Sequence, residues 1–418
     1  MKEIPDPRCN RKKTHDCAEV LTYLIMGYIC GRTALRRALA WALANEELLR
    51  KYMKLSGGIA SVSTVSRLLG SIDEEIFALT FADWVSQFLN RRGLHIIIDG
   101  KALRAATKKI ENGNTPYTLN AIDAATEMVM AQMAVDLKTN EITAIPKLIE
   151  TIDVEDNLVT IDAIGTQIPI MEQLNELGAG FMLQVKGNQP QLYKDICSYF
   201  DYVEDEKRKT EEDKTYHTTL DFHEDQTDCY ESNEKNRERY EYRKVTTSVN
   251  TACISKMEEM SYIKTIGVVY QVRRLILKDT DGNDVTPSLK SFLEEGSARQ
   301  PKPQAGDGMA DAIQRTGILA NREMTAQEAG KIKREHWRIE NGLHHVLDDA
   351  FREDRSPAKG SRNNLALIRK IAYNIIRYAL HDLARKCSVI AMMDYFADNP
   401  KEMVKYVFNP LKRIEETN

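Results

Sequence analysis

The chain lacks any apolar run long enough to cross a membrane. A bilayer requires about 20 consecutive apolar residues. The longest apolar stretch here, Val20 to Cys30, is interrupted by Thr22 and Gly27. The first residues, MKEIPDPRCNRKK, also lack the apolar segment of a secretory signal. These absences predict a cytoplasmic protein without a membrane partner.

Cysteine is sparse and shows no pairing pattern. The chain has seven cysteines in 418 residues, an odd number, and no CxxC motif. Disulfide frameworks and structural zinc sites both depend on regular cysteine spacing. Cys9 and Cys17 flank His15, but this spacing matches no ligand pattern, so we expect reduced thiols. Internal repeats are also absent, which argues against a solenoid.

An overall excess of basic residues is missing too, because the net charge is −4. The charges are unevenly distributed, however. Residues 355–386 carry eight Lys and Arg against one acid, and residues 1–54 carry eleven against six. Phosphate binding depends on local basic patches, so nucleic acid is not excluded as a partner. Solvated helix faces would give the same pattern, and charge alone leaves both interpretations open.

The N-terminal region has a helical pattern. Residues 17–53 predict two helices with a break at Gly31, and a further helix is expected to begin near Ser61 or Ser63, which are favourable N-caps. This segment is either a helix-turn-helix or part of a plain helical bundle. In the first case the recognition face consists of Ser63, Thr64, Ser66 and Arg67.

From residue 95 the pattern changes to strands alternating with helices. HIIID (95–99) and NLVTID (157–162) are apolar runs typical of strands buried on both faces, and AGFMLQVKGNQ (179–189) predicts another strand. TPYTLNAID and EMVMAQMAVD predict a hairpin between the first two of these runs. KTNEITAIPKLIETI and GTQIPIMEQLNELG predict helices. The resulting β-β-β-α-β-α-β order indicates a mixed sheet covered by helices.

Residues 190–320 differ in character from the segments on either side. They are acidic and polar, with short β-like runs such as YEYRKVTTSV, and predict an insertion with its own small sheet. PKPQAGDGMAD (301–311) is expected to be a loop. Helical patterns then return, first with an N-cap at Thr325. In LALIRKIAYNIIRYALHDL the apolar residues form one stripe, and we expect the basic residues on the opposite face.

Two aspartates close apolar strands in equivalent settings. Asp99 is followed by Gly100, and Asp162 is followed by Ala163. If the two strands are neighbours, the carboxylates emerge side by side at one edge of the sheet. An aspartate in this place is often only a turn former, but two of them favour a functional pair.

Glu340 is the third candidate carboxylate. On a regular helix, His336, Glu340 and His344 share a face with Leu343 and Leu347. A glutamate on such an inward-facing stripe needs a partner, either a metal ion or a salt bridge. Converging carboxylates are what two-metal phosphodiester cleavage requires, because Mg²⁺ prefers oxygen ligands.

Taken together, these motifs resemble the DDE superfamily of insertion-sequence transposases, most closely its H-repeat-associated branch. The matching pieces occur in the family's order and cover nearly the whole chain. They are DPR (6–8), IDGKALRAA (97–106), KTNEITAIP (138–146), VTIDAIGTQ (159–167), LQVKGNQ (183–189) and HWRIENGLHHVLDDAFRED (336–354).

The resemblance implies an α/β fold: an RNase H-like mixed-sheet core with a helical N-terminal domain and a largely β insertion between the second aspartate and the glutamate. The expected domains are a helical, DNA-end-binding domain at 1–90, the first part of the core at 91–190, the insertion at 191–322, the C-terminal helices of the core at 323–390, and a tail at 391–418.

The resemblance also implies the activity, which is metal-dependent cleavage at the element's ends and strand transfer into target DNA. Asp99, Asp162 and Glu340 are then the catalytic, metal-binding residues for two Mg²⁺ ions, with Mn²⁺ able to substitute. The partners are the terminal inverted repeats and target DNA, bound by a homodimer or larger assembly. Expected DNA contacts are Lys101, Arg104, Lys186, Asn188, Gln189, Arg338 and Asn341, with Ser66 and Arg67 in the N-terminal domain.

The chain departs from the family pattern at three places. It has His344-His345 where His-Trp is usual, Leu347 where related branches have lysine, and GILAN (317–321) in place of a tyrosine-rich strand. Three alternatives therefore remain: a catalytically decayed DNA-binding protein, an RNase H-like nuclease without strand transfer, and a zinc enzyme. The zinc enzyme would use His336, His344 and His345, although no HExxH spacing supports it.

Overall fold

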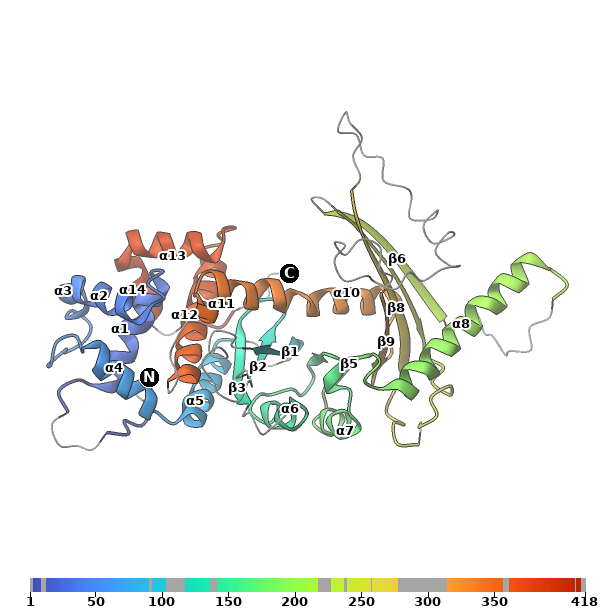
Figure 1. The fold of residues 1–418 in the computed structure, drawn as a ribbon, viewed down its shortest axis with the longest axis horizontal. Coiled ribbons are helices and arrows are strands. Elements are labelled where there is room, and N and C mark those ends of the chain that lie inside the picture. Colours follow the sequence, from blue (N-terminus) through green and yellow to red (C-terminus); the bar gives the residue numbers. More distant parts are fainter. Residues whose placement is uncertain are drawn as a thin grey trace, which may run out of the picture. The chain divides into compact units, whose positions relative to one another are not determined.

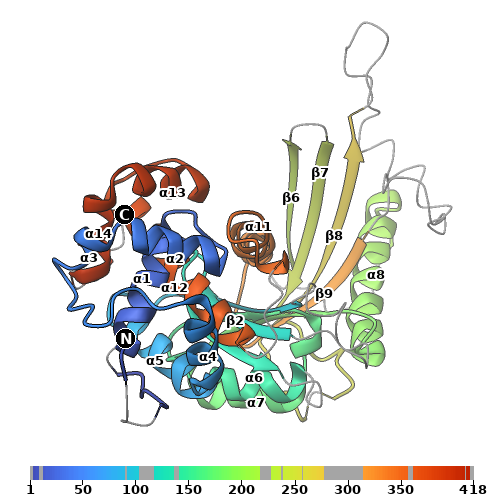
Figure 2. The ribbon, with the colours of Figure 1, turned by 60° about the vertical axis from the view of Figure 1, so that its left-hand side comes forward.

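The computed structural model describes residues 3–8, 13–89, 92–102, 117–135, 141–216, 227–236, 239–256, 258–276, 314–355, 361–409 and 411–414. The chain forms two compact units. Unit 1 comprises Met1–Ile161, Glu172–Ala179 and Glu335–Asn418, and unit 2 comprises Asp162–Met171 and Gly180–Arg334. Figures 1 and 2 show the elements of both units.

Unit 1 contains a helical layer built from both ends of the chain (Figure 1). Its N-terminal helices are α1 (Cys17–Ile29), α2 (Leu35–Ala44), α3 (Glu46–Leu49), α4 (Val62–Ser71) and α5 (Glu74–Ser86). Its C-terminal helices are α11 (His345–Asp349), α12 (Arg362–Asp382), α13 (Val389–Asp398) and α14 (Pro400–Phe408).

Helices α1 and α12 pack against each other in the core of this layer. Helix α1 is apolar around its circumference, and most of its residues are buried, as expected for a helix surrounded by others. Its N-cap is Asp16, whose side chain accepts a hydrogen bond from the Glu19 amide. The core of unit 1 therefore depends on segments more than 300 residues apart in the sequence.

The sheet of unit 1 has the strand order β3-β2-β1-β4. Strands β1 (His95–Ala102), β2 (Tyr117–Asp123) and β3 (Val129–Val135) are antiparallel neighbours, and β4 (Leu158–Ile161) runs parallel to β1. Helix α6 (Glu141–Ile149) packs on β2 and β3. Helix α7 spans Ile168–Glu176. The predicted hairpin is confirmed, and so is the neighbouring position of the two strands that precede Asp99 and Asp162 in the prediction. The predicted strand end at Asp99 is wrong, because β1 continues to Ala102 in its pairing with β2.

Unit 2 has a second run of strands, in the order β5-β9-β8-β7-β6 with antiparallel pairing between neighbours. The strands are β5 (Gly180–Val185), β6 (Thr227–Asn236), β7 (Arg239–Ser248), β8 (Thr265–Leu275) and β9 (Gln314–Ala320). Helix α8 (Pro190–Glu212) lies along the β8–β9 side (Figure 2). Helix α10 begins at Ala326 and ends at His336. The mixed α/β fold expected from the sequence is thus present.

Some sequence predictions of elements need correction. The long helix expected over 33–53 is interrupted at Asn45, where α2 ends and α3 begins. Residues 190–320 do carry strands, but they begin with the 23-residue helix α8, which the β-like composition did not suggest. The segment 301–311 lies outside the described residues, and the boundaries between the five expected domains remain predictions.

The basic residues of α12 were expected on the face opposite its apolar stripe, and two of these residues are buried. Lys370 is fully buried and Arg369 is 3% exposed. Lys370 donates to the Gln132 side chain at 2.5 Å, and the Arg369 guanidinium lies over the Tyr28 ring at 5.9 Å. The long aliphatic part of a lysine or arginine side chain can pack in an apolar layer when its charged group binds a polar or aromatic partner.

Within the described parts of the chain, no helix is both long enough and apolar enough to span a bilayer.

Candidate functional site

Asp99 lies in the middle of β1, directly after the part of the strand that pairs in parallel with β4. Ile98 pairs with Ile161, and Asp99 and Asp162 are the residues that directly follow. Asp99 and Glu340 belong to unit 1, and Asp162 belongs to unit 2. Gly100 is required after Asp99, because a Cβ there would lie 2.0 Å from the Tyr117 ring.

A row of polar side chains crosses the sheet of unit 1 from Asp99. Asp99 pairs with Asn120 on β2, and Asn120 pairs with Gln132 on β3, so the three side chains lie on one face. Asn120 is fully buried and Gln132 is 4% exposed. The row ends at Lys370 of α12, which donates to Gln132. Burial lowers the pKa of Lys370 to about 8. A buried polar row of this kind is costly unless its members bind one another or a ligand.

Lys101 also lies on this face of β1, two residues after Asp99. It is 5% exposed, and its Nζ donates to Asp348 Oδ1 at 2.5 Å and lies 3.7 Å from Glu353 Oε2. Glu353 is itself 2% exposed. In this structure the Lys101 ammonium is therefore enclosed by two carboxylates, and its predicted contact with DNA stays a prediction.

Glu340 opens a π-helical turn, Glu340–His344, between α10 and α11. Its side chain is exposed, so the expected inward-facing stripe of a regular helix is wrong at this position. The physical reason is the i→i+5 bonding of the π turn, which breaks the four-residue spacing on which that stripe depended. Exposure leaves the carboxylate accessible to a ligand.

His344 at the end of the π turn approaches Asp99, with 3.8 Å between Nδ1 and Oδ2. Burial lowers the pKa of His344 to about 3, and the nearby charges of Lys101 and Lys370 act in the same direction. The imidazole is therefore neutral at physiological pH and adds no positive charge beside Asp99. His336, by contrast, is buried and bonded to Thr160.

The donors around Asp99 suit a hard divalent cation. In the described part of the chain, no group of three or more His, Cys, Asp and Glu side chains lies close enough together to hold a metal ion. On the face that carries Asp99, however, the buried oxygens Thr118 Oγ1 and Asn120 Oδ1 have no hydrogen-bond partner among the described residues. Unsatisfied buried oxygens next to a carboxylate are consistent with a missing water or ion, and oxygen is the ligand that Mg²⁺ prefers.

In unit 2, Asp162 caps the short 3₁₀ turn Ala163–Gly165. It accepts hydrogen bonds from the Ala163 amide at 2.6 Å and from Lys186 Nζ at 3.1 Å. Asp162 and Lys186 are each about half exposed. Asn188 donates to the Ala163 carbonyl at 2.7 Å. Lys186 and Asn188 thus lie where the sequence motif predicted, beside the second aspartate.

Lys333 of α10 is buried near the same aspartate. It is 7% exposed, and its Nζ donates to Gln184 Oε1 at 3.3 Å. Burial, with the nearby charge of Lys186, lowers the pKa of Lys333 to about 7, while the charge of Asp162 opposes the shift. Lys333 is not among the residues predicted from the sequence, because nothing in the sequence of a charged helix indicates which lysine is buried.

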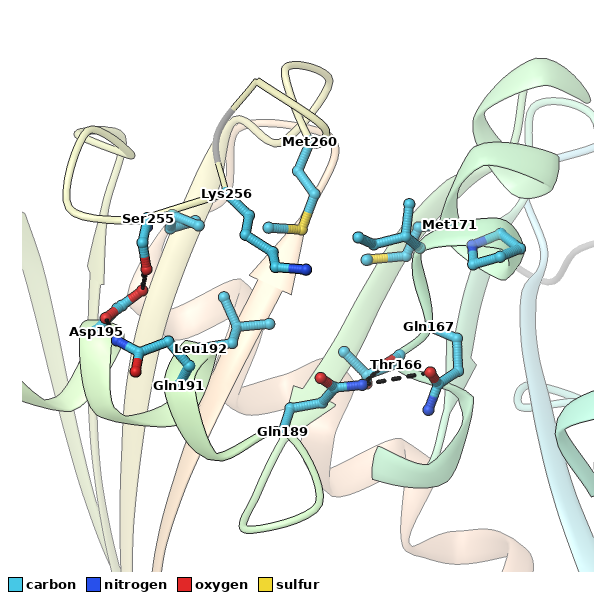
Figure 3. A pocket seen from close by; sticks show the side chains of 13 residues that line it. Thr166, Gln167, Met171, Gln189, Gln191, Leu192, Asp195, Ser255, Lys256 and Met260 are labelled. Carbon is cyan, nitrogen blue, oxygen red and sulfur yellow. Dashed lines mark hydrogen bonds between the residues drawn. The ribbon is translucent and has the colours of Figure 1, made fainter.

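Unit 2 contains a pocket of about 280 Å³, and part of its lining comes from residues 166–171, shortly after Asp162 in the chain (Figure 3). Its lining includes Met171, Leu192 and Met260 as apolar members and Lys256 as a cation. Gln189 borders it and donates to the Thr166 carbonyl at 2.8 Å. Gln189, a predicted DNA contact, thus holds the loop that follows Asp162.

The remaining predicted DNA contacts are only partly described. Arg338 is exposed on the segment before the π turn, and Ser66 and Arg67 are exposed on α4. Arg104 and the side chain of Asn341 lie outside the described residues. The helix α4 begins with the predicted cap, because Ser61 accepts from the Thr64 amide. The sequence also missed Asn120, Gln132 and Glu353, which only strand pairing and tertiary packing bring to the site.

Comparison with known proteins defines the family to which the chain belongs. A family model described as "Transposase DDE domain" matches residues 90–375, and one described as "DDE_Tnp_1-associated" matches residues 1–85. The chain therefore belongs to the DDE transposase family.

Relatives place it within that family. "Putative transposase YncI" of Escherichia coli O157:H7 is 27% identical over 379 residues, which are 90% of this chain and 85% of the relative. "H repeat-associated putative transposase YhhI" of Escherichia coli K12 is 26% identical over 379 residues, 89% of this chain and 88% of the relative. This chain is a DDE transposase of the H-repeat-associated branch.

A solved structure, the cryo-EM structure of the piggyBac transposase synaptic complex with hairpin DNA, has a low similarity. The TM-score is 0.35 at 10% sequence identity, over 78% of this chain and 59% of that chain.

Proposed function

We propose that this transposase cuts phosphodiester bonds at the ends of its element and joins the freed ends to target DNA, with a divalent metal ion as cofactor. The observation that carries the proposal is the parallel register of β1 and β4. Asp99 and Asp162 directly follow the paired residues Ile98 and Ile161. Two carboxylates that follow paired positions of adjacent parallel strands form the start of an oxygen-rich metal site.

Asp99, Asp162 and Glu340 would hold two Mg²⁺ ions, and Mn²⁺ is expected to substitute. When bound, such ions lower the pKa of the attacking hydroxyl and stabilise charge on the leaving oxygen. The exposed Glu340 and the half-exposed Asp162 are accessible to ions and to DNA.

The reaction needs no protein nucleophile. In the first step water attacks the phosphodiester at the element's end, the P–O bond to the 3′ oxygen breaks, and a 3′-OH is released. In the second step this 3′-OH attacks a phosphodiester of the target, and the target's own 3′ oxygen leaves. Each step exchanges one P–O bond for another, and the protein contributes position and charge.

Exposed cationic and polar residues would bind the DNA. We place Lys186 and Arg338 at the backbone near the cut, because ammonium and guanidinium groups pair with phosphate. We assign recognition of the terminal repeats to the helical region 1–90, with Ser66 and Arg67 of α4 at its surface. These assignments follow from exposure and from the family motif.

The test is a cleavage and strand-transfer assay with purified protein, Mg²⁺ or Mn²⁺, and a labelled duplex that carries the element's end. Wild type is compared with Asp99→Asn, Glu340→Gln and, as a matched control, Glu402→Gln, which changes an exposed glutamate of α14. We expect nicked and joined products from wild type and the control, and at least about 100-fold less from the other two, since metal-site electrostatics dominate such barriers.

Each other outcome assigns a different function. Nicking without joined product, even from a pre-cleaved end with a free 3′-OH, would identify a nuclease. Specific binding of the end with no product in either metal would identify a decayed, DNA-binding transposase. Full cleavage by Asp99→Asn would show that the proposed metal site is wrong.

A further inference from the structure

The segment that follows Glu340 is tied to the strand that carries Asp99. Asp348 lies on α11 and Glu353 in the 3₁₀ turn Glu353–Arg355, both C-terminal to the π turn that Glu340 opens. Both carboxylates face the ammonium of Lys101 on β1, at 2.5 Å and 3.7 Å. All of these residues belong to unit 1.

Burial makes it difficult for water to replace the contact between Lys101 and Glu353. Lys101 is 5% exposed and Glu353 is 2% exposed, so neither can exchange its partner for bulk water. Both Glu353 oxygens also lack a hydrogen-bond partner among the described residues. Its charge is therefore balanced mainly by Lys101 and by Lys370, which lies close enough for the two charges to interact. Removing one member of a buried ion pair leaves the charge of the other member uncompensated. The backbone must then shift before water can reach this charge.

The contact acts on both candidate carboxylates of unit 1. Lys101 is two residues from Asp99 on the same face of β1, so a shift of Lys101 moves Asp99. A π turn has weak intrinsic preference, so neighbouring contacts must hold Glu340–His344 in place. One such contact lies within the turn, where the Tyr373 hydroxyl donates to the Gly342 carbonyl at 3.1 Å. The other follows the turn, where Lys101 donates to Asp348 of α11.

We propose that Lys101, Asp348 and Glu353 form a positioning cluster that fixes Asp99 relative to Glu340. The inference rests on the proposed metal-dependent function, and it assigns a role to the DDAFRED segment (348–354). The cluster touches neither substrate nor metal in this proposal. It acts through the two carboxylates, as the outer partners of metal ligands do in other sites.

The experiment compares wild type with Asp348→Asn, Glu353→Gln and the charge-retaining Asp348→Glu, with Glu402→Gln as the matched control. Three quantities are measured on the full-length chain: Mn²⁺ affinity of the protein–DNA complex by electron paramagnetic resonance of free Mn²⁺, affinity for the element's end, and hydrogen exchange of residues 340–349. Thermal unfolding of each variant separates loss of fold from loss of position.

We expect Asp348→Asn and Glu353→Gln to weaken Mn²⁺ binding about 10-fold or more, with faster exchange in 340–349 and unchanged DNA affinity. Asp348→Glu should recover most of the Mn²⁺ affinity, because it keeps the charge opposite Lys101. The control should match wild type in all three measurements.

Two results would overturn the inference while leaving the proposed function intact. One is a lower melting temperature with wild-type Mn²⁺ affinity and wild-type exchange in 340–349, which would mark a purely structural contact. The other is a loss of affinity for the element's end alone, which would assign the cluster to DNA binding. A wild type that neither binds Mn²⁺ nor cuts DNA would instead overturn the proposed function, and unchanged exchange in the variants would then overturn the positioning cluster as well.

Discussion

At the scale of single residues, lysines are the group whose environment the sequence conceals most. Lys101, Lys333 and Lys370 are each no more than 7% exposed, although lysine is rarely buried in proteins. Each one lies close to a residue of the candidate site or of the polar row that ends there. The position seven residues after Glu340, where related branches have lysine, is the buried Leu347. In unit 1, buried ammonium groups reach the site from β1 and α12 instead.

Lys333 should make the stability of the protein depend on pH. Its folded pKa is about 7 against an ordinary 10.5, so between these values the unfolded chain binds more protons. Stability therefore rises as the pH rises from 7 to 10.5, and the charge of Lys333 is most costly below pH 7. We expect Lys333→Met to raise the free energy of unfolding by about 3 kcal/mol at pH 7 and by much less at pH 10.

Urea unfolding of wild type and Lys333→Met at the two pH values measures this difference. The exposed Lys405 supplies the control, since Lys405→Met should change stability little at either pH. A gain of equal size at pH 7 and pH 10 would contradict the assigned pKa and point to better apolar packing alone.

At the scale of elements, helix starts were the most predictable features. Thr325 was expected as a cap and forms a capping box. Its Oγ1 accepts from the Glu328 amide at 3.2 Å, and the Glu328 carboxylate accepts from the Thr325 amide at 2.9 Å. These bonds lower the pKa of Glu328. Capping is local in sequence, which explains why Ser61 and Thr325 were both found without tertiary information.

Thr325→Ala should therefore destabilise the protein by about 1 kcal/mol, because the Glu328 amide loses its acceptor and the Glu328 carboxylate loses the hydroxyl that donates to it. The measurement is chemical unfolding at pH 7. Thr80→Ala, in the middle of α5, is the matched control. It removes only the hydrogen bond from the Thr80 hydroxyl to the Ile76 carbonyl of the same helix and should change stability little, since alanine is the better helix former. Equal losses in the two variants would mean that the capping box contributes no stability.

The π turn and α8 are elements that the periodicity of the sequence did not predict. A four-residue spacing from His336 to His344 favours a regular helix, yet tertiary contacts at Gly342 and α11 coincide with a wider turn. Helix α8 begins with Pro190, and proline at the first position of a helix is a start signal. The acidic composition of 190–320 obscured this signal. Composition averaged over a long segment hides a helix within it.

At the scale of the whole molecule, the units are not continuous in sequence. The chain passes between unit 1 and unit 2 at 161–162, 171–172, 179–180 and 334–335. The first of these crossings falls between Ile161, the last residue of β4, and Asp162. The sequence distance of 178 positions from Asp162 to Glu340 is accounted for mainly by unit 2.

Transposition must act on both ends of an element, so we expect the active assembly to contain at least two copies of the chain. Mass photometry of the protein with a duplex carrying the element's end measures this directly. The expected species contains two or more chains and two duplexes, and its yield should fall with salt, because phosphate contacts release counterions. A duplex without the terminal repeat is the control. A complex of one chain and one duplex at saturation would contradict the expected assembly.

The sequence by itself determined the order of strands and helices in the core, the helix caps at Ser61 and Thr325, and the end of a strand directly before Asp162. These features depend on local periodicity and on residues next to one another in the chain. The tertiary structure alone decided that Lys370 is buried against Gln132, that Asn120 lies opposite Asp99, and that Lys101 faces Asp348 and Glu353. The reason is physical: a long polar side chain is buried or exposed according to whether a partner lies within its reach, and those partners come from strands and helices far away in the sequence.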